Sequence, residues 1–494
     1  MSSSALRIAL PLAAAFRARR AAPLLALIAG CAVGPDFVRP GLPERAAWAA
    51  TAQGTSGATA DEPALARWWS RFDDPVLTAL VERSSGSNLD LLQARARLRE
   101  ARARRGSAAA DLAPMVTGSG SAARTRSSVE PDTRATVNLF QVGLDASWEI
   151  DLFGGTRRAV ESASATEQAA VEDVRDVRVS LVAEVGLTYL DLRTTESRLA
   201  LARQNLATLQ ETADLTHWRA DAGLTTQLDA EQARANLEAQ RAAVPPLERD
   251  LVKDRNALAV LLGLQPGALD AQLQAARPVP LVARAVAVGV PADTLRRRPD
   301  VRRAERKLAA QTAQVGVAQA ARFPALTLSG SIGLESLTAG SLLESGAVTS
   351  SLGAGLLAPI FNAGKLARAV EVQDALREQS LLAYRAAVLT ALREVENALV
   401  TFDREQVRRS ALTRATDAAR QAASLARDQY EAGLVAFTSV LDAERTLLTL
   451  QDSLATSEGE VGATLIRLYK ALGGGWSPGD RAKTGAAPAS QETP

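Results

Sequence analysis

The sequence predicts a mainly helical α+β membrane protein whose chain contains two copies of one structural unit. Three observations support this fold class. The chain matches itself at an offset of 210 residues, as Asp90 and Asp300 illustrate. Two long stretches without proline, 156–219 and 365–430, carry the apolar spacing of coiled coils. Four short stretches have the length that crosses a bilayer as tilted strands.

The first 30 residues have the composition of a lipoprotein signal peptide. Arginines within 17–20 precede an apolar run that ends with small residues directly before Cys31. We expect cleavage there and lipid attachment to Cys31, although a lone cysteine after an ordinary signal peptide is the alternative. Residue 32 is alanine and not the aspartate that retains lipoproteins at the inner membrane. The mature chain is therefore expected to be anchored at the outer membrane.

Composition excludes several classes of function. Lys and Arg number 57 and Asp and Glu 55, a difference of +2, and the two signs are interleaved. No basic surface for nucleic acid is therefore expected. Cys31 is the single cysteine, so disulfides are not expected. No stretch after Cys31 approaches the roughly 20 apolar residues of a spanning helix, so any crossing must use strands.

The internal repeat sets the predicted domain organisation. Matched positions include Pro114 with Pro324, Gly120 with Gly330, Glu184 with Glu394 and Gly263 with Gly473. These pairs share one offset, and chance identity in an alanine-rich chain does not explain them. We predict an acylated N-terminal segment at 31–75, repeat units at 76–265 and 292–475, a proline-rich linker at 266–291 and a disordered tail at 476–494.

Each unit is predicted to begin with a helix and a β-hairpin. The helices are expected at 88–112 and 293–322, the second with Asp293 as its N-cap, and each ends at a proline. Apolar and polar residues then alternate in 139–150 and 326–334, which indicates strands with one apolar and one polar face. Weaker strands are expected at 115–123 and 351–357.

A long helical hairpin follows each pair of strands. The outgoing helices are predicted at about 156–219 and 365–430, and the second return helix at 436–472. The first return helix follows Gly223, and Pro245-Pro246 should break or kink it. Some 60 residues at 1.5 Å each give a helix of roughly 90–100 Å.

Four strands are too few to close a membrane barrel. Small membrane barrels have at least about eight strands, and an open edge in lipid leaves backbone groups unpaired. Chains must therefore combine their strands, and three chains would supply twelve. The polar faces, with Asp145 and Glu149, would then line a water-filled lumen. A water-soluble hairpin on a structural coiled coil is the alternative.

Several motifs resemble one family, the TolC-like outer-membrane factors of tripartite efflux systems, and within it the NodT/OprM-type lipoproteins. The motifs are CAVGPDFVRP at 31–40, RPDVRRAE at 298–305 followed by Phe323-Pro324, two Ala-Gly-Leu turns, and Leu441-Asp442-Ala443. The resemblance covers about 31–475. It implies a homotrimer with a twelve-stranded β-barrel and a twelve-helix periplasmic tunnel. It also implies two partners, a periplasmic adaptor and an inner-membrane pump of the resistance-nodulation-division type.

The resemblance assigns roles to residues at the helical tips. Residues of the two turns match the family's adaptor-contacting ends, namely Ala222, Gly223, Leu224, Ala432, Gly433 and Leu434. Asp442 matches an aspartate that rings the closed periplasmic aperture, and Tyr430 matches a tyrosine that ties neighbouring coils together. The family often has a bulky apolar residue where this chain has Thr438, which argues against a tight apolar seal.

An enzyme is not expected from the residue inventory. His217, the single histidine, lies near a tip turn without a cysteine partner, and 473–475 is a glycine-rich helix stop. No cofactor or metal site is therefore predicted. The expected function is a passive outer-membrane conduit for drugs or other toxic small molecules. A type I protein-secretion channel and a periplasmic adaptor or structural lipoprotein are the alternatives.

Overall fold

The computed structural model describes residues 32–41, 48–49, 55–56, 62–126, 136–280, 286–287 and 291–477. The chain divides into two compact units. The first, called the sheet unit, comprises Met1–Pro40, Arg99–Ala169 and Ala304–Tyr384. The second, called the helical unit, comprises Gly41–Leu98, Ala170–Arg303 and Arg385–Pro494. Each unit takes residues from both predicted repeats, because the long helices extend through both units.

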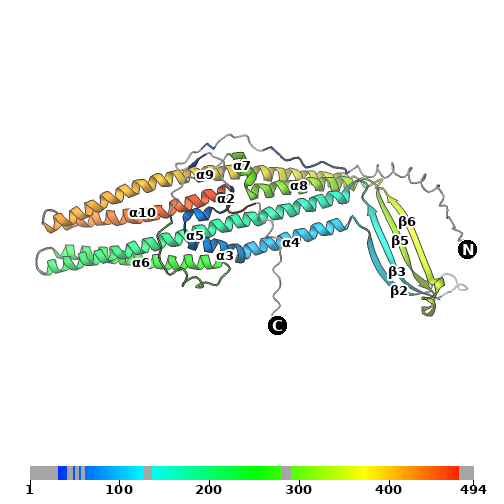
Figure 1. Ribbon diagram of the computed structural model, residues 1–494, viewed down its shortest axis with the longest axis horizontal. Coiled ribbons are helices and arrows are strands. Elements are labelled where there is room, and N and C mark those ends of the chain that lie inside the picture. The colour runs from blue at the N-terminus through cyan, green and yellow to red at the C-terminus, as the bar shows by residue number, and fades with distance from the viewer. Residues whose placement is uncertain are drawn as a thin grey trace, which may run out of the picture. The chain divides into compact units, whose positions relative to one another are not determined.

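One antiparallel sheet of four strands dominates the sheet unit (Figure 1). Its strands are β2 (Met115–Arg126), β3 (Thr136–Ile150), β5 (Ala325–Ser336) and β6 (Val348–Leu357), in the order β2-β3-β5-β6. All four strands were predicted. Each observed strand extends slightly beyond its predicted range, at one end or at both. The pairing of β3 with β5 joins the two repeats, with Asp145 opposite Ser331.

The sheet has one polar and one apolar face. Polar side chains bond across the strands: Ser119 donates to Asp145 (3.1 Å), and Gln141 donates to Glu335 (2.9 Å). Val142 and Leu144, which alternate with these positions along β3, are 52% and 54% exposed. The sheet thus has an apolar face that the described residues leave uncovered.

The chain also forms two helical hairpins, and a helix of 22 residues precedes each pair of strands (Figure 1). Their bounds are α4 (Leu89–Ala110), α5 (Gly155–Asp221), α6 (Gln227–Leu261), α8 (Pro299–Ala320), α9 (Lys365–Glu431) and α10 (Phe437–Ala471). Among the described residues, no helix is both long enough and apolar enough to cross a membrane. Helix α6 continues through Pro245 and Pro246, so the predicted break is absent. Val244 and Leu247, which flank the two prolines, pack against the main core of the helical unit.

The helix predicted at 293–322 is wrong as a single element. The chain forms α7 (Pro291–Arg297) and α8 (Pro299–Ala320), and Arg298 lies between them. Pro299 disfavours the helical conformation of the residue before it. Arg298 also donates to the backbone oxygen of Ala471 (2.8 Å) and to Glu394 (2.6 Å). Asp293 consequently lies within the first turn of α7 and is not an N-cap.

Shorter elements complete the described chain. They are β1 (Thr55–Ser56), α2 (Glu62–Ala66), the 3-10 helix η1 (Trp68–Phe72), α3 (Pro75–Ser87), β4 (Val286–Ala287), and the 3-10 helices η2 (Ala339–Ser341) and η3 (Ser345–Ala347). Strand β1 pairs in parallel with β4. Helix α3 begins where Asp74 accepts hydrogen bonds from the backbone of Val76 and Leu77.

The main core of the helical unit gathers around Trp68, which is fully buried. Its ring stacks on Tyr469 at 5.6 Å between centroids. Gly186 allows this approach, because a Cβ there would lie 2.9 Å from the Trp68 ring. Trp476, which the predicted tail included, is 2% exposed, so that part of the tail prediction is wrong. Residues 478–494 lie outside the described residues.

Candidate functional site

Both helical tips close with the same glycine turn. At the end of α5, Gly223 N donates to Ala220 O (3.0 Å) and Leu224 N donates to Arg219 O (2.8 Å). Gly433 and Leu434 repeat this pattern at the end of α9. These bonds form Schellman motifs, which satisfy carbonyl groups left over at the helix ends. Gly223 and Gly433 have φ of +70° and +73°, which other residues adopt only at a cost.

The two tips differ in how the return helix begins. Thr226 caps α6 in a capping box, in which its hydroxyl accepts from Asp229 N (3.2 Å) and its own N donates to the Asp229 carboxylate. Slight burial opposes ionisation of Asp229, but hydrogen bonds from Thr225 and Thr226 outweigh it and lower the pKa of this carboxyl group. Helix α10 begins after Ala436, which offers no side-chain cap. The second tip is thus locally less reinforced than the first.

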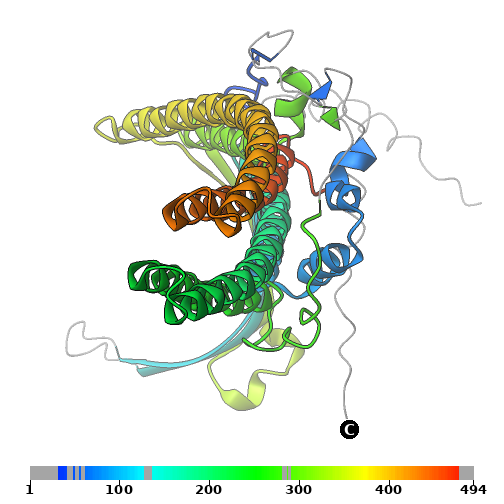
Figure 2. The same ribbon diagram turned by 90° about the vertical axis from the view of Figure 1, so that its left-hand side faces the viewer.

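The tips of both hairpins lie at the same end of the helical unit (Figure 2). They contact each other through Tyr430. Its hydroxyl lies 3.3 Å from the Thr225 hydroxyl, and the Arg219 guanidinium lies 5.0 Å from the centre of its ring. The Phe437 ring also contacts the tyrosine, at 5.2 Å between ring centroids. A small apolar core beneath them comprises Leu209, Ala213, Ala233, Leu237, Phe437, Val440 and Leu441. Tyr430 therefore joins the end of α9 to the first tip.

Polar contacts that the sequence analysis did not anticipate reinforce the second hairpin. Arg427 Nε donates to Glu444 (2.8 Å), whose side chain is 3% exposed. Arg445 Nε donates to Asn236 (2.9 Å) and so connects α10 with α6. The pairing of Arg427 with Glu444 was hard to recognise in the sequence, because the two residues are 17 positions apart and a turn lies between them.

The remaining predicted tip residues lie at the surface. Asp442 and Thr438 are exposed on the first two turns of α10. Leu224 and Leu434 are 70% and 75% exposed. Ala222 and Ala432 are likewise exposed. His217 is exposed as well and lies 3.5 Å from Asp221 one helical turn later, which agrees with its interpretation as a surface residue.

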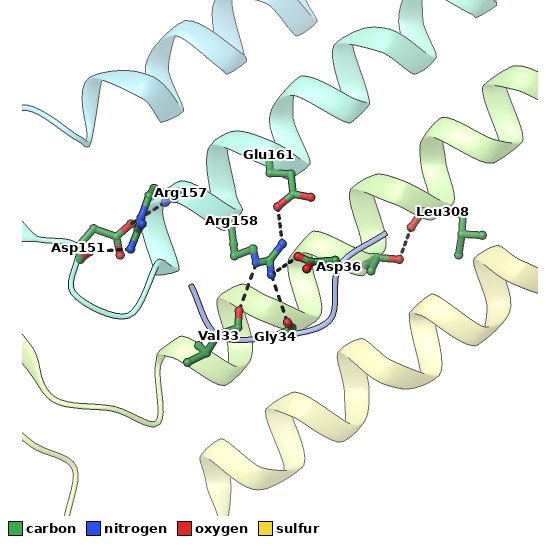
Figure 3. A network of polar contacts seen from close by, with 9 residues as sticks. Val33, Gly34, Asp36, Asp151, Arg157, Arg158, Glu161 and Leu308 are labelled. Carbon is green, nitrogen blue, oxygen red and sulfur yellow. Dashed lines mark hydrogen bonds and ion pairs between the residues drawn. The ribbon is translucent and has the colours of Figure 1, made fainter. Parts of the chain in front are cut away.

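A second site lies in the sheet unit, where residues 32–40, called the strap, run along the helices (Figure 3). Val33 N donates to Phe153 O (3.0 Å), immediately after β3. The Arg158 guanidinium donates to the backbone oxygens of Val33 and Gly34 (3.2 Å each) and to Asp36 (2.7 Å). The strap is therefore held at the junction between strand and helix.

Close backbone packing fits the strap to this place. A Cβ on Gly34 would lie 2.4 Å from Gly316 Cα, so a larger residue would displace the strap from α8. Further along, Arg39 pairs with Glu305 (2.9 Å). Ala32, the first described residue, lies beside Gly154, where an added Cβ would come within 2.7 Å of it. Cys31, the predicted lipid-bearing residue, lies outside the described residues.

Two glycine-tipped hairpins that follow a membrane-length sheet, each built once per repeat, define a recognisable architecture. The family profile described as outer membrane efflux protein matches residues 80–264 and 290–474. The chain belongs to the outer membrane efflux protein family. Each match covers one copy of the internal repeat, so this family assignment rests on both halves of the chain.

Relatives of this efflux protein extend over nearly its whole length. Nodulation protein T of Rhizobium leguminosarum bv. trifolii is 34% identical over 459 residues, covering 92% of this chain and 96% of that protein. The solvent efflux pump outer membrane protein SrpC of Pseudomonas putida is 33% identical over 465 residues, 92% of this chain and 97% of that one. The pyoverdine export outer membrane protein OpmQ of Pseudomonas putida is 36% identical over 418 residues, with coverages of 83% and 88%.

Solved structures show the same fold. The outer-membrane channel OprN superposes with a TM-score of 0.85 at 37% identity, covering 91% of this chain and all of that one. The open state of the Neisseria gonorrhoeae MtrE outer membrane channel gives 0.81 at 27% identity, with coverages of 90% and 99%. The predicted family, the TolC-like mainly helical fold and the function as an outer-membrane efflux channel are thereby confirmed.

Proposed function

We propose that this efflux protein is a homotrimer in which three chains form one continuous conduit. The main support for this proposal is the four-stranded sheet, in which the edge strands β2 and β6 are each paired with another strand on one side. Its strands have 12, 15, 12 and 10 residues, enough to cross a bilayer. Unpaired edges in lipid are too costly to persist, so β6 of one chain pairs with β2 of the next.

Three chains give three times four, or twelve, strands in a closed barrel. The polar face with Asp145, Gln141 and Glu335 lines the lumen, and the exposed apolar face meets lipid. The helical hairpins extend the lumen through the periplasm as a tunnel of twelve helices. The conduit takes small molecules, such as drugs or other toxic compounds, from a periplasmic adaptor and an inner-membrane pump of the resistance-nodulation-division type.

Particle mass tests the trimer directly. The detergent-solubilised protein should have the mass of three chains by light scattering corrected for bound detergent. A monodisperse monomer that retains its strand content would refute the shared barrel.

The lipid anchor at Cys31 is a second part of the proposal. The strap supports it, because Ala32 packs against Gly154 where β3 leads into α5, at the expected membrane boundary. An acyl chain on the preceding residue would start at that boundary. Mass spectrometry of the mature N-terminal peptide should show acyl chains in the native protein and none in Cys31→Ser. A native peptide without added mass would remove the anchor.

The tips are proposed to bind the adaptor. Gly223 and Gly433 set the turns, and Leu224 and Leu434 present exposed apolar side chains at their ends. The double variant Leu224→Glu with Leu434→Glu should weaken adaptor binding at least tenfold. Leu343→Glu is the matched control, because Leu343 is 86% exposed in the sheet unit. Equal affinity of the double variant and the control would contradict the assignment.

The gate is proposed to form at Asp442. In the closed trimer three Asp442 carboxylates converge on the axis and bind multivalent cations. Like charges at such short distances from one another need a counter-charge. Tyr430 holds the adjacent coil in place through Thr225 and Arg219. Thr438 lines the same aperture, and three threonines do not form the bulky apolar constriction that larger side chains would make there.

Single-channel current in planar bilayers tests the gate. A trivalent cation should block the wild type, more weakly at high salt, and Asp442→Ala should relieve the block. Glu431→Ala, which removes an exposed carboxylate at the end of α9, is the matched control and should stay blocked. Thr438→Leu should lower the residual current of the closed state. If Asp442→Ala were blocked as strongly as the wild type, Asp442 would not be the cation ligand.

A further inference from the structure

A cavity of about 440 Å³ lies within the helical unit, away from the tips. Residues of η1, α3, α4 and α5 line it, and Trp476 forms part of its wall. The apolar part of the lining includes Trp69, Leu91, Leu98 and Val174. The volume falls within the range typical of small-molecule sites.

The polar part of this cavity is strongly basic. Four guanidinium groups line it, those of Arg67, Arg95, Arg175 and Arg178, against the single carboxylate of Glu82. Arg175 is compensated by Glu172, which accepts its hydrogen bond at 2.6 Å. Arg95 forms no ion pair among the described residues, so its positive charge faces the cavity.

The buried Arg95 Nε and Trp476 Nε1 of the lining have no acceptor among the described residues. Arg95 is held in place from its other end, where Nη2 donates to Ser85 O (3.0 Å). Burial, together with the positive charge of Arg178, lowers the pKa of Arg95. Buried donors in native proteins are almost always paired, so these two indicate a missing acceptor.

The Trp476 ring is itself fixed by cations. The Arg175 guanidinium lies 4.4 Å from the ring centre, and those of Arg302 and Arg297 lie at 5.5 and 5.8 Å. This arrangement holds the indole in one orientation while leaving its N–H without a partner. A preorganised donor beside an excess of positive charge is suited to an anion.

We propose that this cavity binds a single-chain amphiphile with an acidic head group, a carboxylate or a phosphate. The head group accepts hydrogen bonds from Arg95 Nε and Trp476 Nε1 and neutralises Arg95. The apolar chain lies along Trp69, Leu98 and Val174. This ligand site goes beyond the channel function and does not depend on it, since every residue named belongs to the helical unit of one chain.

Tryptophan fluorescence provides the test, because bromine atoms quench nearby indoles and Trp69 and Trp476 both line the cavity. The protein in amphipol is titrated with 11-bromoundecanoate, 11-bromoundecyl phosphate and the neutral 11-bromoundecanol. Saturable quenching by either acid, at a concentration at least tenfold below that of the alcohol, supports the site. Comparing the two acids then identifies the head group as carboxylate or phosphate.

Variants separate the site from unspecific partition. Arg95→Gln should raise the half-saturating concentration of the acids about tenfold and leave the alcohol unchanged. Arg83→Gln is the matched control, because Arg83 is exposed on α3 and does not line the cavity. Arg178→Gln provides a second variant if Arg95→Gln fails to fold. Equal quenching by acid and alcohol, no saturable quenching, or acid binding unchanged in both variants would overturn the proposal.

Discussion

The protonation of Asp254 makes the stability of the helical unit depend on pH. This residue lies half-buried on α6, near the carboxylates of Asp191 and Asp250. Burial, followed by these two negative charges, raises the pKa of Asp254 from 3.8 to about 6, and Lys253 and Thr195 oppose the shift only partly. The folded chain therefore holds this proton more tightly than the unfolded chain does.

The direction of the effect follows from linkage. The stabilising contribution of protonated Asp254 is fully present below about pH 4 and is lost as the pH rises through about 6. The difference of 6 − 3.8 in pKa corresponds to about 3 kcal/mol per chain, an upper value because the side chain is partly exposed. Of this upper value, at most about 1.4 kcal/mol is lost between pH 5 and pH 8, and solvent screening of the partly exposed side chain reduces it further.

Asp254→Asn removes the titrating group and should flatten this dependence. Thermal unfolding followed by circular dichroism at 222 nm compares both proteins at pH 5 and pH 8. For a cooperative unit of roughly 300 residues, 1.4 kcal/mol corresponds to about 2 °C. Between pH 5 and pH 8 the melting temperature of the wild type should therefore fall by up to about 2 °C more than that of the variant.

A matched control isolates this carboxyl group. Asp270→Asn neutralises an exposed aspartate of the same unit and should keep the wild-type pH dependence. The reasoning is refuted if Asp254→Asn shows the same loss of melting temperature as the wild type. An Asp254→Asn variant that is less stable than the wild type at pH 8 would also contradict it.

Three further predictions concern contacts that hold the hairpins and the strap. Arg427→Gln should destabilise the second hairpin by about 1–3 kcal/mol, because Glu444 stays buried without its cation, and hydrogen exchange near the tip should increase accordingly. Arg158→Ala removes three acceptor contacts of the strap, so limited proteolysis should cleave within 32–40 faster than in the wild type, and an unchanged rate would argue against docking. Tyr430→Phe deletes the hydroxyl that meets Thr225, which should cost about 0.5–1 kcal/mol and raise the closed-state current, whereas identical conductance would exclude a role in the gate.

Much of the fold could be read from local patterns along the chain. The strand at 139–150 and the helices at 156–219 and 365–430 agree with β3, α5 and α9 to within a few residues. Alternation and coiled-coil spacing are properties of single elements, so they are visible without any partner. The break at Arg298 was also visible in principle, since Pro299 restricts the residue before it.

Other parts of the structure depended on packing that no local pattern records. Pro245 and Pro246 remain helical because Val244 and Leu247 are packed against the core. Trp476 is buried although low-complexity sequence follows it, because arginines from α5 and the α7–α8 region surround its ring. In both cases tertiary contacts outweigh the local preference.

The residues of the candidate site also form two groups, those that the sequence could predict and those that depend on tertiary packing. Gly223 and Gly433 were found from the sequence, because a turn with positive φ requires glycine whatever surrounds it. The partners of Tyr430 were not, because Thr225 lies 205 residues away and meets it only through the packing of two hairpins. The strap and the basic cavity likewise depend on segments brought together from distant positions.

The sequence by itself determined the two repeats, the type and approximate length of each principal element, and the turns at the tips, since each follows from periodicity or from the conformational limits of glycine and proline. Only the tertiary structure decided that β3 pairs with β5, that Arg158 holds the strap, and that Arg95 and Trp476 face one cavity. Such contacts depend on the register and rotation of long helices against one another. A shift of one residue rotates a helix by about 100°, and many distant pairings would satisfy the same amphipathic pattern.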